Sequence, residues 1–278
     1  MSALRNSWSL LRASWNVLRL DSELVFFPLM SGVASMLVLA TFVVPIVVAE
    51  GWSVVGGFGS GYASWVVAFL FYLTNYFVIF FFNSALVGAA LIRMDGGDPT
   101  VGDGLRIAFG RLGAILSYAA ISATVGMILK VIARRSGFLG KLVTGFLGVA
   151  WTFATFLAVP VLVTRNVSGL DAVKQSAQLF RSTWGEQVTA HLGFGWAGTV
   201  LTLAWTLISA GALALGIWLA SPSVIVVALI TAVTGYIVLT LVLSALSGIY
   251  NAALFRYATT GDPGLFDEGL VRGAFGAR

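Results

Sequence analysis

Six long apolar runs alternate with short polar segments along the chain. Each run reaches or exceeds the roughly 20 residues that an α-helix needs to cross the hydrocarbon core of a bilayer. The pattern therefore predicts an all-α, polytopic membrane protein with about six transmembrane helices. The expected spans cover residues 24–49, 62–94, 112–132, 137–163, 188–220 and 223–257.

The polar segment between the fourth and fifth runs, residues 168–186, has the residue spacing of an amphipathic helix. Ser168 and Asp171 stand three residues apart, as in a capping box, so we expect the helix to begin there. An apolar face that ends in an aromatic residue suits the surface of a bilayer. This face would contain Leu170, Val173, Ala177, Phe180 and Trp184.

Residues 2–21 show the same kind of pattern before the first run. Such a stripe also fits a coiled-coil seam. We favour the membrane surface, because the segment leads directly into a span and its two tryptophans are typical of the membrane interface. The stripe consists of Leu4, Trp8, Leu11, Trp15 and Leu18.

One short element recurs in four polar segments: an arginine, any residue, a small residue and an aromatic residue. Its arginines are Arg12, Arg106, Arg181 and Arg272. Because each of the first three precedes two apolar runs, the repetition predicts three parallel units of one surface helix and two spans. Chance resemblance between apolar segments is the alternative.

The predicted units cover about 1–96, 97–166 and 167–260, and an amphipathic tail follows at 261–278. Two further matches support them. GDPTVGDG at 97–104 resembles GDPGLFDEG at 261–269, and NSAL at 83–86 resembles NAAL at 251–254. Asp98 and Pro99 are expected to be the N-cap and the first residue of a surface helix.

The composition agrees with a membrane protein, with 59% hydrophobic and only 10% charged residues. A mean hydropathy of +0.96 is far above that of soluble domains of this length. The net charge of +5 therefore indicates contact with lipid head groups, and we expect no nucleic-acid partner. The absence of cysteine excludes disulfides and thiolate chemistry.

Most basic residues fall in the segments that share one side with the N-terminus, whereas segments 50–61 and 221–222 contain none. The positive-inside rule therefore places both termini in the cytoplasm. The connection between the third and fourth spans disagrees, since it is basic and would lie outside. Either these two segments form a re-entrant pair, or the loop lies outside, which we favour because both segments are long enough to span. An outside loop is either tolerated by a topology that its neighbours fix, or it is a basic mouth that attracts anions or lipid phosphates. Its bases are Lys130, Arg134, Arg135 and Lys141.

Few side chains suited to chemistry lie within the predicted spans. The polar candidates are Asn75, Asn83, Asn251 and His191, the last being the only histidine. Amides in spans either line a pore or join helices, and we favour the second. A lone histidine forms no metal cluster, and glycines at 193, 195 and 198 lack the strand that a dinucleotide site requires. We expect no catalytic residues, no metal and no cofactor.

The segment FLAVPVLVTRN followed by GLDAVKQSAQLFRSTWGE, residues 156–186, resembles an uncharacterised family of prokaryotic polytopic membrane proteins. This resemblance implies a six-span fold and a location in the plasma (inner) membrane. It implies no activity.

Two functions agree with these features, and neither is enzymatic. The first is a passive homo-oligomeric channel or pore for small solutes, including anions, with the 130–141 bases as a ring at its outer mouth. The alternative is a non-conducting membrane-organising or assembly protein that binds anionic lipids or partner proteins. It would use Arg12, Arg106, Arg181 and Arg272 as phosphate anchors. A lipid-handling transporter or enzyme is a third, weaker interpretation.

Overall fold

The computed structural model describes residues 2–50, 62–135, 137–184 and 193–272. This part of the chain is helical almost throughout and contains no strand. Six of its segments are long and apolar enough to cross a membrane, as the sequence predicted. They are Ser22–Pro45, Ser64–Met94, Leu112–Ala133, Gly140–Thr164, Ala197–Trp218 and Pro222–Thr260. The protein is thus an all-α, multi-pass membrane protein.

Surface helices and spanning helices alternate in the observed element order. The helices are α1 (Ser2–Leu20), η1 (Ser22–Val25), α2 (Phe26–Glu50), α3 (Tyr62–Met94), α4 (Val101–Phe109), α5 (Leu112–Arg135), α6 (Gly137–Thr155), α7 (Ala158–Thr164), α8 (Gly169–Trp184), α9 (Gly193–Trp218), α10 (Pro222–Thr260) and α11 (Glu268–Arg272).

Two boundaries correct the sequence prediction. The fourth span is interrupted between α6 and α7, after Thr155, instead of running continuously over 137–163. The N-cap of α4 is Thr100 and not Asp98, because Thr100 Oγ1 accepts the Asp103 N–H in a capping box. A carboxylate from η1 supports the same terminus, since Glu23 Oε2 accepts the Val101 N–H at 3.2 Å.

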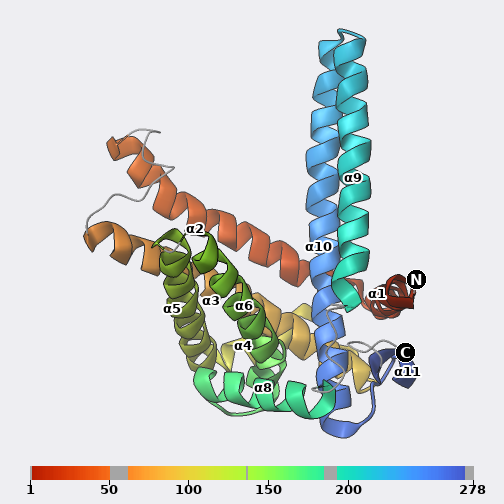
Figure 1. Cartoon of the computed structure of the whole chain (residues 1–278). Coiled ribbons are helices and arrows are strands. Elements are labelled where there is room, and N and C mark those ends of the chain that lie inside the picture. Colours follow the sequence, from red (N-terminus) through yellow and green to blue (C-terminus); the bar gives the residue numbers. More distant parts are fainter. Residues whose placement is uncertain (1, 51–61, 136, 185–192, 273–278) are drawn as a thin grey trace.

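Three helical hairpins diverge from a common end of the molecule, which we call the base (Figure 1). They are α2–α3, α5–α6 and α9–α10. In the figure the last of these forms two long helices that lie side by side. Helix α3 is central, because it contacts α2, α4, α5, α7 and α10. The surface helices gather at the base: α1 contacts α9 and α10, whereas α8 contacts α5, α6, α7 and α10.

The hydrophobic core lies at the base. It combines buried side chains from all three hairpins and from the surface helices, including Phe27, Leu86, Leu162, Trp184 and Leu254. In the most apolar stretch of each span, by contrast, only 6% to 33% of the residues are buried inside the chain. The base therefore holds the chain together, and the outer parts of the spans present apolar side chains to the bilayer.

Glycines allow helices to approach closely at the base. A Cβ on Gly104 of α4 would lie 2.7 Å from the Ala85 carbonyl oxygen, and one on Gly248 of α10 would lie 2.3 Å from Cδ2 of Leu86. Both neighbours belong to α3. Small residues thus bring α4 and α10 against the central helix.

Candidate functional site

The last turn of α3 carries an arginine that pairs with two aspartates. Arg93 Nη2 lies 3.4 Å from Asp21 Oδ2 and also pairs with Asp98. Asp21 joins α1 to η1, and its side chain is only 5% exposed, against 93% for Asp98. We call these three residues the Arg93 clasp. It ties the N-terminal surface helix to the end of the central span.

A second arginine, Arg256 of α10, does the same for the third hairpin. Its Nη2 atom lies 3.0 Å from Asp262 Oδ2, and the guanidinium also pairs with Asp95, which directly follows α3. Gly264, at a φ of +65°, donates its N–H to Asp262 Oδ1 at 2.9 Å. That bond and Arg256 lower the pKa of Asp262. This Arg256 clasp joins α10 to the end of α3.

The two clasps share a sequence pattern. AALIR at 89–93 and AALFR at 252–256 each end in the clasp arginine, and each is followed by Asp-Pro, at 98–99 and 262–263. In this register Asn251 corresponds to Gly88, and not to Asn83 as the shorter match suggested. The middle unit has Arg165 after α7, and its Nη1 donates to Gln175 Oε1 at 2.6 Å. Arg93 and Arg256 thus bind the segment that follows their own helix, whereas Arg165 binds α8 itself.

Helix α8 is hydrogen-bonded to two spans. The helix begins after Ser168 as predicted, and one of the two capping-box bonds is present, because Ser168 Oγ accepts the Asp171 N–H at 3.2 Å. The Gly169 N–H donates to Ser117 Oγ of α5 at 2.8 Å, and Ser176 Oγ accepts the Leu157 N–H, at the break before α7, at 2.9 Å.

The face of α8 that packs on the protein differs in part from the predicted stripe. Phe180 and Trp184 are buried as part of it, whereas Leu170 is exposed and Val173 is only partly buried. The buried face instead contains Gly169, Ala172, Ser176, Phe180 and Trp184. The apolar face of α8 therefore covers the ends of the spans, which corrects its expected placement against lipid.

Helices α1 and α4 keep aromatic residues on the outside. In α1 the predicted stripe divides: Leu11 and Leu18 are buried, whereas Trp8 and Trp15 are exposed. The side chain of Leu4 lies outside the described residues. Phe109 of α4 is exposed as well.

Residues 62–265 match a family described as a family of unknown function (DUF6159). The chain belongs to this family. The expectation of an uncharacterised family of polytopic membrane proteins is thereby confirmed. The range that matches DUF6159 includes Arg93, Arg165 and Arg256. Helices α1 and α2 lie outside it. Neither a curated protein nor a solved structure is significantly similar to the chain.

The four predicted phosphate anchors of this DUF6159 member all lie on the outside of surface helices. The side chain of Arg106 is 82% exposed and has only an exposed partner, Asp103 Oδ1, at 3.3 Å. Arg12, Arg181 and Arg272 are exposed too. Their role in binding phosphate stays a prediction.

The predicted outer basic ring is only partly described. Lys130 of α5 donates to the Tyr72 hydroxyl of α3 at 2.7 Å, and its Nζ lies 5.2 Å from the centre of the Tyr72 ring. Lys141 is exposed. The side chains of Arg134 and Arg135 lie outside the described residues. Lys130 is thus held within its own chain.

The polar candidates in the spans lie at different depths of the fold. The amide oxygens of Asn75 and Asn251 are buried without a hydrogen-bond partner among the described residues, as is Ser84 Oγ. Asn83 is partly buried. His191 lies outside the described residues.

Because of Asp21, the folding stability of the base of the molecule should depend on pH. Burial raises the pKa of its carboxyl, against the opposing effect of Arg93, while Glu23 and Asp98 raise it further. A raised folded-state pKa means that the folded protein binds this proton more tightly than the unfolded chain. The resulting stabilisation is complete below the unfolded pKa of about 3.9 and is lost as the pH rises through the folded pKa.

The measurement is thermal unfolding of the parent and of Asp21→Asn between pH 4 and 7. The parent should gain stability relative to the variant as the pH falls. Parallel pH profiles of the two proteins would contradict this origin of the effect.

Proposed function

We propose that the protein organises a membrane without catalysing a reaction, by holding anionic lipid head groups at its base. The observation that carries this proposal is the arrangement on α1 and α4. Trp8 and Trp15 lie four residues before and three residues after Arg12, and Phe109 lies three residues after Arg106, so each arginine shares a helical face with an exposed aromatic residue.

This pairing of side chains suits the boundary between lipid head groups and acyl chains. A guanidinium group binds phosphate oxygens in a bidentate manner. Tryptophan and other aromatic rings settle at the level of the head groups. Arg181 would add positive charge only, because Trp184, the aromatic residue beside it, is buried in the protein. The aromatic residue that follows Arg272 lies outside the described residues.

We assign the base to the cytoplasmic leaflet of the plasma membrane, with both termini on that side. The excess of arginine at the base supports this orientation. Each basic residue near an anionic leaflet contributes about 1 kcal/mol to lipid attraction. The clasps would support the function by keeping α1, α4 and α8 in fixed positions.

A channel made of several copies is the second candidate. The uncovered outer parts of the spans favour it. Association of copies would bury these apolar faces. Since Lys130 is bound to Tyr72, an outer basic ring would depend on Arg134, Arg135 and Lys141.

Two charge-reversal variants separate the candidates. The basal variant carries Arg12→Glu, Arg106→Glu and Arg181→Glu, and the distal variant carries Arg134→Glu, Arg135→Glu and Lys141→Glu. Both change the net charge equally, so each is the control of the other. The basal variant should retain far less anionic lipid per chain after purification, and the distal variant should match the parent.

Conductance of the same proteins in planar bilayers tests the second candidate. An organising protein passes no current. Anion-selective current that the distal variant weakens or reverses would replace our proposal with the channel. Equal lipid retention by the basal variant and the parent would reject the anchoring role itself.

A further inference from the structure

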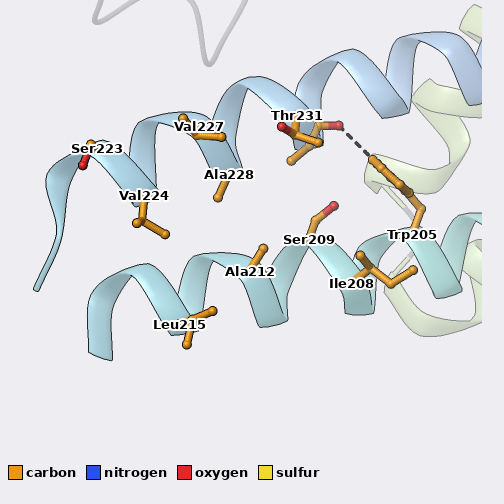
Figure 2. A pocket seen from close by; sticks show the side chains of 11 residues that line it. Trp205, Ile208, Ser209, Ala212, Leu215, Ser223, Val224, Val227, Ala228 and Thr231 are labelled. Atoms are coloured by element: carbon orange, nitrogen blue, oxygen red, sulfur yellow. Dashed lines mark hydrogen bonds between the residues drawn. The ribbon is translucent and has the colours of Figure 1, made fainter. Parts of the chain in front are cut away.

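A groove lies between α9 and α10 near the tip of their hairpin, far from the clasps along both helices (Figure 2). Its volume is about 440 Å³, within the range of roughly 300–1,000 Å³ that is typical of small-molecule sites. The lining is mostly apolar and contains no charged side chain. Ala212 and Ala228 are the small side chains that leave space between the two helices.

An aromatic side chain closes the inner end of the groove. Trp205 Nε1 donates to the Ala232 carbonyl of α10 at 3.2 Å, which fixes the indole ring between the helices. Gly235 provides the space for this ring, because a Cβ there would lie 1.9 Å from Cζ2 of Trp205. The groove therefore ends at a flat, rigid aromatic surface.

One buried hydroxyl in the groove has no hydrogen-bond partner. Thr202 and Thr206, earlier on α9, donate to the backbone carbonyls of Gly198 and Thr202. Ser209 makes no such bond: its Oγ is unpartnered although the residue is only 8% exposed, and it points across the groove towards α10 (Figure 2). A hydroxyl donor without a partner destabilises the fold in a bilayer, because no water is present to accept its hydrogen bond.

The depth of Ser209 restricts the molecule that can bind it. Trp218, exposed at the tip of the hairpin, suits the membrane interface. Ser209 lies nine residues earlier, about 13 Å along the helix at 1.5 Å per residue. That distance approaches half of the roughly 30 Å hydrocarbon core, so the ester groups of phospholipids at the interface do not reach it. The ligand must carry its oxygen into the hydrocarbon region and must be uncharged.

We propose that the groove binds a quinone with an apolar tail. The flat, electron-poor quinone ring would lie against the electron-rich face of Trp205, with the offset that stacked π systems prefer. One ring carbonyl would accept the proton of Ser209 Oγ, and the tail would run past Ala212 and Ala228 towards the tip. The site binds the quinone without changing its oxidation state. It is separate from the base, so it does not depend on the lipid-anchoring function.

The test measures binding of a benzoquinone with a decyl tail to the full chain in lipid nanodiscs. The parent should show saturable binding. Ser209→Ala should weaken it about 3- to 10-fold, the effect of one lost hydrogen bond. Ala228→Phe should abolish it by filling existing space. Thr41→Val is the control, because the hydroxyl of Thr41 donates to the Leu37 carbonyl on α2 at 2.8 Å, and it should bind like the parent.

Two results would overturn the proposal. The first is the same unsaturable partitioning of the quinone into nanodiscs that contain the parent or any of the variants. The second is efficient disulfide formation between two copies of Ala228→Cys, unaffected by the quinone. The chain has no other cysteine, so this disulfide would place a second copy in the groove.

Discussion

Replacing Gly169 by valine should detach α8 from the ends of the spans. A Cβ at this position would lie 2.3 Å from the backbone nitrogen of Tyr118 and 2.5 Å from Ser117 Oγ. The closest atom belongs to the backbone of α5, so a side-chain rotation does not relieve the overlap; we expect the start of α8 to shift and the Gly169 N–H to leave Ser117. Overpacking costs about 1–3 kcal/mol and an unsatisfied buried N–H a similar amount.

The detachment can be followed by limited digestion with trypsin. Lys174 and Arg181 on α8 should be cleaved much faster in the valine variant, because a detached helix opens more often. Gly113→Val, in the first turn of α5, is the matched control, since a Cβ there meets nothing within 4 Å. Equal cleavage rates in the parent and Gly169→Val would show that α8 is not held at this contact.

Replacing Arg93 by methionine should destabilise the base by about 3–5 kcal/mol, because it leaves the buried Asp21 without its counter-charge. Asp21→Asn in the same chain should restore most of the loss, since a neutral amide has no unpaired charge. Asp98→Asn should change stability by less than about 1 kcal/mol, because Asp98 is almost fully exposed.

A double-mutant cycle over Arg93 and Asp21 in thermal unfolding measures this coupling. Strictly additive effects of Arg93→Met and Asp21→Asn would mean that the ion pair contributes nothing to the stability of the base.

The sequence was sufficient for the class of fold, because each span is a long apolar run that few alternative structures could contain. The end of α10 shows where this signal fails. Residues 252–255 are as apolar as the rest of the span, but they are buried in the protein core and not against lipid. Hydropathy alone does not distinguish a helix that is buried in protein from one that is buried in lipid.

The sequence also contains the pattern of the clasps, as AALIR and AALFR before Asp-Pro. From the sequence alone, however, we interpreted their arginines only as indicators of membrane topology. Pairing Arg256 with Asp95 needs the fold, because 161 positions separate them. The prediction of which face of α8 is buried was partly wrong for a related reason. Glycine, alanine and serine at 169, 172 and 176 carry little hydropathy, although all three are buried.

The groove could not have been predicted from periodicity. It results from alanines on two neighbouring helices and from the position of one tryptophan, and none of these residues is unusual in a span. Only the missing bond of Ser209 sets it apart, and that is a property of packing.

The break between α6 and α7 has a consequence for biogenesis. The Leu157 N–H lies within an apolar span, and its partner, Ser176 Oγ, is 19 positions further along the chain. While the ribosome is still making α8, the fourth segment has an unsatisfied backbone donor within its apolar sequence, near the end that meets the base. Its final position in the bilayer thus depends on translation reaching Ser176, so we expect ribosome-bound chains that end before α8 to hold this segment only loosely in the insertion machinery.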